Sequence, residues 1–216
     1  MDMSKRLEKR SYESGILINK AKKGKYNNPD AVSKVKRYVL GEEGSSKAGR
    51  SDVIHYGAYG AVDFLDTDFI EEQFFDVQKC YVRHGKNKRY ADHEIFVFPE
   101  DAGRVLKQHP SHIPEIAGKM ASAISDGEFQ TFYGVHNGSQ YDERYPETNG
   151  KLHIHFLVNP VSFKTFKKRQ ENFAATAEHE AELQRLVRAE VAAIDGKERT
   201  CSEKTTQNRD GNAFSC

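Results

Sequence analysis

The segment KLHIHFLVN, residues 151–159, places two histidines one residue apart in an otherwise apolar run. Side chains of a β-strand alternate between two faces, so Ile154 and Phe156 point one way while His153 and His155 point the other. The first face is apolar and belongs in a core. We therefore expect a central strand whose apolar face lies under helices and whose histidine face opens to a cleft.

Other segments supply the partners that such a strand needs. Apolar patterns predict strands at residues 93–98 and 130–136, and a short apolar-rich segment occupies residues 53–57. Helical spacing predicts helices over residues 29–40, 67–81, 114–124 and 168–194. Together they predict an α+β fold, a two-layer sandwich in which helices pack on a central, antiparallel-rich β-sheet.

The length of 216 residues suits one domain with tails. We expect a basic N-terminal arm at residues 1–25, the domain at 26–196 and a disordered polar tail at 197–216. Every apolar stretch is far shorter than the ~20 residues that cross a bilayer. The three cysteines are widely spaced and form no CxxC motif. We therefore expect a cytoplasmic protein with free thiols and no membrane partner.

The formal net charge of +1 hides an uneven distribution of charge. Residues 1–50 carry 13 Lys and Arg against 6 Asp and Glu, and residues 151–170 carry five against none. Such blocks suit contact with a phosphate backbone. The alternative is that they are solvated surface or, for residues 1–25, a loose arm.

The two strand histidines are also suited to metal binding. Their backbones lie about 7 Å apart, so both imidazoles can reach one cation at about 2.0 to 2.2 Å. His136, at the end of the predicted strand 130–136, would supply a third ligand. Three histidines with open positions suit Mn²⁺ or Mg²⁺, with Zn²⁺ possible, as a Lewis acid. Without His136, the pair His153 and His155 would equally suit a hydrogen-bonded structural role.

The order of these motifs resembles a known family. GVH at residues 134–136 followed by LHIHFLVNPVSF at 152–163 resembles the three-histidine motif of MobA/MobL-type relaxases, plasmid mobilisation nucleases of the HUH endonuclease group. RYADHEIFVF, residues 89–98, is similar to the strand that precedes this motif. SKVKRYVLGEEGSSKAG, residues 33–49, is similar to the motif that carries the nucleophilic tyrosine. The resemblance runs from about residue 28 to residue 194.

The chain departs from the family pattern near the first histidine. Gly138 stands where the family often has an acidic residue, and the loop between the first and second histidines is longer here. The missing carboxylate leaves open which group orients the His136 imidazole. Asp142 and Glu147 in that loop are candidates, or they are ordinary solvated charges.

The resemblance implies a relaxase, a metal-dependent, site- and strand-specific DNA endonuclease and transesterase. Such an enzyme nicks one strand at an origin of transfer through a 5′-phosphotyrosyl intermediate, which starts conjugative mobilisation of a plasmid. The nucleophile would be Tyr38, with Tyr26 as the alternative, and Asn159 and His93 would support the site. The residues expected to hold DNA phosphates are Lys34, Lys36, Arg37, Lys164, Lys167, Lys168 and Arg169. Candidates for stacking on bases are Tyr133, which equally suits the core, Tyr141 and Tyr145.

The partner expected from this resemblance is single-stranded DNA at an origin of transfer. An accessory DNA-binding protein, a helicase and a type IV coupling protein would complete the process. Two alternatives share the scaffold: a rolling-circle replication initiator with the same chemistry, and a catalytically silent DNA-binding protein. A silent protein would keep its DNA affinity after Tyr38→Phe and would form no covalent product.

Overall fold

The computed structural model describes residues 15–19, 26–41, 52–61, 67–81, 89–139, 146–170 and 173–210. The strands in these ranges are β1 (Ile16–Asn19), β2 (Val53–Tyr59), β3 (Asp92–Val97), β4 (Phe129–His136) and β5 (His153–Ser162). The helices are α2 (Asp30–Val39), α3 (Asp68–Lys79), α4 (Glu100–Gln108), α5 (Ile113–Ile124) and α6 (Phe173–Asp210), with short 3₁₀ helices η2 (Pro110–His112) and η3 (Pro146–Thr148).

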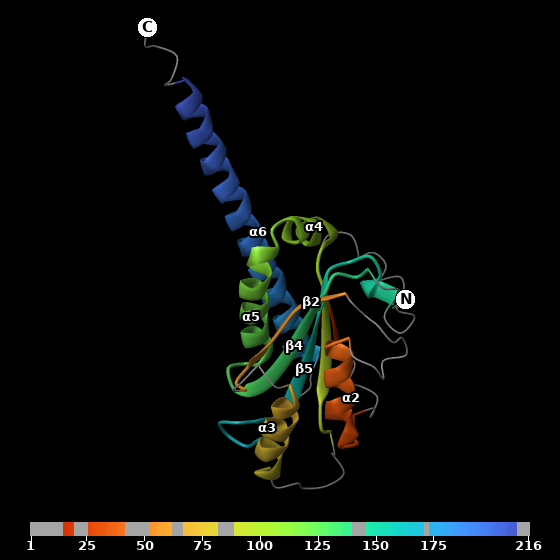
Figure 1. Cartoon of the computed structure of the whole chain (residues 1–216). Coiled ribbons are helices and arrows are strands. Elements are labelled where there is room, and N and C mark those ends of the chain that lie inside the picture. Colours follow the sequence, from red (N-terminus) through yellow and green to blue (C-terminus); the bar gives the residue numbers. More distant parts are fainter. Residues whose placement is uncertain are drawn as a thin grey trace, which may run out of the picture.

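The strands form one sheet in the order β1-β3-β5-β4-β2, and every neighbouring pair is antiparallel. The histidine strand β5 is the middle strand, as predicted (Figure 1). It is bordered by β3 and β4, the two other strands that the sequence predicts. The α+β class with an antiparallel sheet is therefore confirmed.

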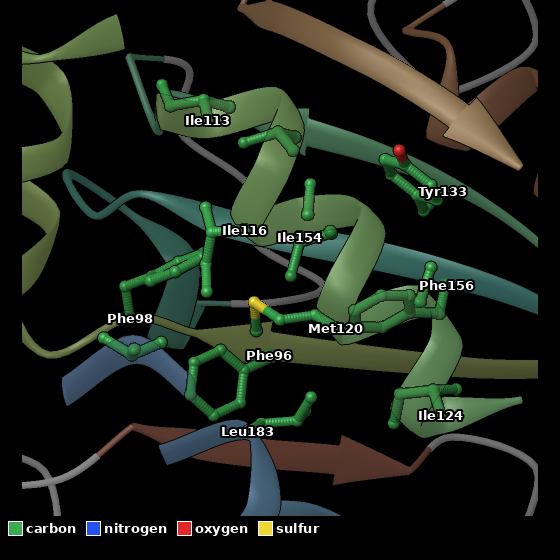
Figure 2. Packing of buried hydrophobic residues seen from close by; sticks show 14 of the residues in the cluster. Phe96, Phe98, Ile113, Ile116, Met120, Ile124, Tyr133, Ile154, Phe156 and Leu183 are labelled. Carbon is green, nitrogen blue, oxygen red and sulfur yellow. The ribbon is translucent and has the colours of Figure 1, made fainter. Parts of the chain in front are cut away.

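The apolar face of β5 packs under helices, which confirms the predicted alternation. Ile154 and Phe156 lie in a buried cluster with Ile116 and Met120 of α5 and Leu183 of α6 (Figure 2). Burying a large apolar side chain of this kind contributes about 1.5 to 3 kcal/mol. This face is the main core of the domain.

The opposite face of the sheet is also covered by helices. Phe132 of β4 and Leu157 of β5 are buried together with Val35 of α2 and Phe74 of α3. In Figure 1, α2 lies on one side of the sheet and α5 on the other. The sheet thus lies between two helical layers, one more than the predicted sandwich.

Two elements were not predicted, and one of them changes the expected N-terminal arm. Residues 16–19, within the predicted arm, form β1, which pairs with β3 and buries Leu17 in the main core. The run ILIN is too short to stand out among its charged neighbours, and pairing with β3 stabilises it. The other element is α4, whose Leu106 also reaches that core.

The C-terminal helix is longer than expected. The predicted helix ends near Ile194, whereas α6 has 38 residues and continues to Asp210. A single glycine such as Gly196 costs a helix only about 1 kcal/mol, and no proline follows it. The end of α6 extends beyond the other elements (Figure 1). The expected disorder therefore does not apply to the backbone of 197–210, and residues 211–216 lie outside the described residues.

A buried ion-pair cluster fixes the segment that leads from β5 to α6. Nη1 of Arg169 lies 2.5 Å from Oε1 of Glu94 and 3.7 Å from a carboxylate oxygen of Asp92. Burial favours the neutral guanidine, but the two carboxylates outweigh it, so the pKa of Arg169 lies above its ordinary value. Asp92 also pairs with Arg89.

Arg169→Met is expected to lower the free energy of unfolding by about 3 to 5 kcal/mol, because it leaves buried carboxylates without their cation. Urea denaturation measures this change. Arg185→Met is the matched control, since Arg185 is an exposed arginine paired with Glu182 on α6, and surface changes cost within about 0.5 kcal/mol. Equal losses in the two variants would contradict the structural role of Arg169.

Candidate metal and tyrosine site

Three buried histidines converge on the face of the sheet that α2 covers. His136 ends β4 and lies directly opposite His153 of β5, and His155 follows two residues later on the same face. One ring nitrogen from each lies within 4.8 Å of the other two. The ring centroids are 4.7 to 5.1 Å apart. The structure thus brings together the three histidines that the sequence predicts as ligands.

Backbone carbonyls fix the orientation of two of these rings. Nδ1–H of His153 donates to the carbonyl of Lys151 at 2.9 Å, so its Nε2 keeps the lone pair that a metal needs. Nε2–H of His136 donates to the carbonyl of Val39 at 2.8 Å, which leaves the lone pair on Nδ1. Hydrogen bonds to the protein thus set which nitrogen of each ring is available.

Asp52 is the carboxylate that sequence analysis did not find for His136. It is buried immediately before β2, and its Oδ1 lies 3.6 Å from Nδ1 of His136. The backbone of Asn137 donates to the carbonyl of Asp52 at 2.9 Å, which holds the two segments together. Asp52 is 84 residues from His136 in sequence, so only the pairing of β2 with β4 reveals it. Glu147 is exposed in η3, and Asp142 lies outside the described residues.

Tyr38, the predicted nucleophile, lies against the histidines. It occupies the last turn of α2 and is buried. Its ring meets the ring of His155 edge-on at 5.0 Å between centroids and that of His93 at 5.8 Å. A residue more than a hundred positions away in sequence therefore contacts the predicted ligand set.

His93 and Tyr26 form a hydrogen-bonded chain with His155. Nε2 of His93 lies 3.0 Å from Nδ1 of His155, and Nδ1 of His93 lies 3.2 Å from the hydroxyl of Tyr26. His93 is buried on β3, the strand next to β5. The structure thus places His93, the predicted support, and Tyr26, the alternative nucleophile, beside the site.

Gly134 permits the close approach of α2 to the site. A Cβ at this position would lie 2.4 Å from the carbonyl oxygen of Val39 and 2.9 Å from its Cγ1. The same carbonyl accepts the hydrogen bond from His136. Any residue larger than glycine at position 134 would push the end of α2, and Tyr38 with it, away from the sheet.

We expect Gly134→Ala to lower the free energy of unfolding by about 1 to 3 kcal/mol, because the clash involves backbone that cannot rotate away. Gly118→Ala is the control, since its Cβ would meet only the Tyr133 hydroxyl at 3.9 Å within helix α5. Urea denaturation of both variants measures the difference. A Gly134→Ala variant as stable as Gly118→Ala would show that this close contact is unimportant.

Gly138 has a backbone role that explains the absent carboxylate at this position. Its φ is +77°, a conformation that L side chains rarely adopt. A Cβ there would lie 2.2 Å from the carbonyl oxygen of Lys151, the group that orients His153. The tight packing of these two segments excludes an acidic residue at 138.

The described residues do not form the open cleft that the sequence predicts over the histidines. His136, His153 and His155 are all buried, and α2 covers them. A pocket lies nearby, lined by residues of β2, α4, α5 and the segment 137–139, but the three histidines do not line it. Helix α2 has an apolar stripe that needs a partner, and this face of the sheet supplies it.

Asn159 lies on the histidine face but has a structural role. Its amide donates to the carbonyl of Phe74 and to Gln130, and its oxygen accepts from Gln78. These bonds join α3 to β4 and β5 in the interior. Asn159 therefore fixes the helical layer, and it makes none of these contacts with the histidines.

Two of the predicted phosphate-binding residues are buried in ion pairs, which corrects their expected role. Nζ of Lys36 lies 2.6 Å from Oε1 of Glu71 and donates to the carbonyl of Thr67, which ties α2 to α3. Arg169 is held by Glu94. The sequence could not distinguish these cations from exposed ones, because their partners come from other elements.

The remaining predicted cations divide between two places. Lys34 and Arg37 are exposed on α2, the helix that carries Tyr38. Lys164, Lys167 and Lys168 follow the far end of β5, whose last residue, Ser162, lies seven residues from His155, about 23 Å along a strand. The role of this second group in holding DNA phosphates stays a prediction.

The predicted base-stacking tyrosines are not supported where they can be assessed. Tyr133 is buried in the main core, and burial raises the pKa of its phenol. Tyr141 and Tyr145 lie outside the described residues. Exposed apolar side chains on this part of the sheet are instead Ile54 and Tyr56 of the edge strand β2. In the described part of the chain, every helix is too short or too polar to span a bilayer.

Comparison with known proteins places the chain in a family. The family model described as "Relaxase: MobA/VirD2-like, nuclease domain" matches residues 38–190, more than half of the chain. A solved structure of the conjugative relaxase TrwC in complex with oriT DNA, in its metal-bound form, is similar with 13% identity and a TM-score of 0.48, over 84% of this chain and 70% of that one. No curated protein matches. The chain therefore belongs to the MobA/VirD2-like relaxases and carries their nuclease domain.

Proposed function

We propose that this relaxase nicks one DNA strand at an origin of transfer by attack of Tyr38 on a phosphodiester. The observation that carries the proposal is the contact of the Tyr38 ring with His155, within a cluster of three buried histidines. The product would be a 5′-phosphotyrosyl linkage and a free 3′-hydroxyl. Because one ester replaces another, the bond energy is retained and the same site can rejoin DNA during mobilisation.

The three histidines fit a divalent metal ion. Nitrogen ligands at about 2.1 Å from one ion lie at most about 4.2 Å apart, so donor atoms within 4.8 Å need only a small side-chain movement. Neutral imidazoles suit Mn²⁺ or Zn²⁺, and Mg²⁺ more weakly. A bound ion would act as a Lewis acid toward a phosphate oxygen. His136, His153 and His155 would hold it, and the negative charge of Asp52, 3.6 Å from Nδ1 of His136, would favour a cation there.

Attack by Tyr38 exchanges one phosphate ester for another. Its phenol oxygen forms a bond to phosphorus, the phosphorus–O3′ bond breaks, the phenolic proton passes to a base, and the departing oxygen takes up a proton. A phenol has an ordinary pKa near 10, so removal of this proton is needed for attack at neutral pH. The packing of the ring against His155 and His93 restricts its orientation, which favours attack in one geometry.

Lys34 and Arg37 are the proposed phosphate contacts, because both are exposed on the helix that presents Tyr38. The partner is single-stranded DNA at the origin, and binding through such cations should weaken steeply with salt. Accessory, helicase and coupling proteins remain expected partners on the basis of the family alone.

The test uses the purified full chain and single-stranded oligonucleotides tiled over both strands of the DNA that carries its gene. With Mn²⁺, one strand should yield a covalent protein–DNA band on a denaturing gel, and EDTA should abolish it. The absence of such a band on every oligonucleotide, with ordinary noncovalent binding retained, would instead support the silent DNA-binding alternative.

A further inference from the structure

We infer that Tyr26 and His93 are positioning residues that select the ring tautomer of His155, and that Tyr26 is not a second nucleophile. The inference rests on the proposed metal role of the three histidines. It is carried by a continuous chain of contacts from the Tyr26 hydroxyl through both nitrogens of His93 to Nδ1 of His155, with distances of 3.2 and 3.0 Å.

The direction of this chain decides whether His155 can bind a metal through Nε2. A neutral imidazole carries one proton, so each nitrogen is either a donor or an acceptor. If Nδ1–H of His155 donates to Nε2 of His93, then Nδ1–H of His93 must donate to the Tyr26 oxygen. In that arrangement Nε2 of His155 keeps its lone pair. In the reverse arrangement Nε2 carries a proton and cannot act as a ligand.

Tyr26 is suited to hold the chain in the productive direction. A tyrosine hydroxyl can accept from His93 and still donate its own proton elsewhere, whereas a phenylalanine ring offers no acceptor. The backbone of Tyr26 is also fixed, because the amide of Tyr90, just before β3, donates to its carbonyl at 2.8 Å. Tyr26 therefore reaches His93 from a segment that is tied to the same strand.

The two tyrosines relate to His155 in different ways. Tyr38 packs its ring edge directly on His155, with the centroids 5.0 Å apart. Tyr26 meets His93 edge-on at 6.3 Å, and its hydroxyl is engaged with the Nδ1 of that ring. Tyr38 therefore contacts a proposed metal ligand directly, whereas Tyr26 acts on that ligand through the imidazole of His93.

The experiment measures Mn²⁺ and Zn²⁺ affinity of the full chain by chelator competition, together with adduct formation at saturating Mn²⁺. Tyr26→Phe is expected to weaken metal binding by about threefold to tenfold, and His93→Leu by about 10- to 100-fold. His93→Gln should lose less than His93→Leu, because a glutamine amide can accept from His155 and donate to Tyr26. Tyr38→Phe and Tyr56→Phe should leave metal affinity unchanged.

Adduct formation separates the possible outcomes. At saturating Mn²⁺, Tyr26→Phe should regain the covalent band and Tyr38→Phe should not. Unchanged metal affinity in Tyr26→Phe would overturn the inference, as would a Tyr26→Phe variant that binds metal normally but makes no adduct. If wild type binds metal no better than His153→Ala, the proposed metal site itself fails. His93→Gln keeps the test decisive if His93→Leu does not fold.

Discussion

Tyr38→Phe is expected to lower the rate of covalent adduct formation by more than about a thousandfold, because removing a nucleophile removes the step it performs. The phenylalanine ring keeps the packing against His155, so the fold and noncovalent DNA binding should persist. Fluorescent origin oligonucleotide, Mn²⁺ and a denaturing gel measure the rate. Urea denaturation confirms that the variant is folded.

Tyr56→Phe is the matched control for this prediction. Tyr56 is exposed on β2 and packs beside Phe132, on the same face of the sheet as the histidines. Its loss of a hydroxyl should leave the adduct rate near that of wild type. A Tyr38→Phe protein that still forms the band would move the nucleophile elsewhere, and Tyr26 would be the next residue to change.

His153→Ala is expected to abolish the stimulation of cleavage by Mn²⁺ and to weaken metal affinity by more than about a hundredfold. The reason is that removing a ligand should cost more than the 10- to 100-fold lost when an outer partner of a ligand is removed. Asp52→Asn should show a smaller effect, since Asp52 lies 3.6 Å from Nδ1 of His136 and would contribute charge beside the ligands rather than a ligand atom. Titration of adduct yield against Mn²⁺ concentration measures both.

His112→Gln is the control for His153→Ala, because it removes a histidine that is not one of the proposed metal ligands. His112 lies in η2 and pairs with Glu190 of α6 at 2.6 Å, away from the ligand set. This variant should keep the full response to Mn²⁺ even if its stability falls. Retained metal stimulation in His153→Ala would show that the three histidines do not form the functional metal site.

The sequence predicted the parts of the site that depend on local periodicity. Alternation along β5 assigned His153 and His155 to the face opposite Ile154 and Phe156, and the structure confirms both faces. His136 was found because it ends a strand of the same kind. A strand repeats every two residues, so the face of a side chain follows from its position alone.

The sequence could not predict the charges and contacts that depend on other elements. Lys36 and Arg169 looked like exposed phosphate contacts, but Glu71 and Glu94 neutralise them in the interior. Asp52 carried no sequence signal as the partner of His136. In each case the deciding neighbour comes from a different strand or helix.

By itself the sequence determined the central strand, the histidine face and the order of the motifs, because these follow from backbone geometry and short-range spacing. The tertiary structure decided that α2 closes over the histidines, that Gly134 lets Tyr38 approach them, and that Tyr26 is linked to His155 through His93. The physical reason is that strand register and helix docking bring distant residues within a few ångströms, and no local pattern records those contacts.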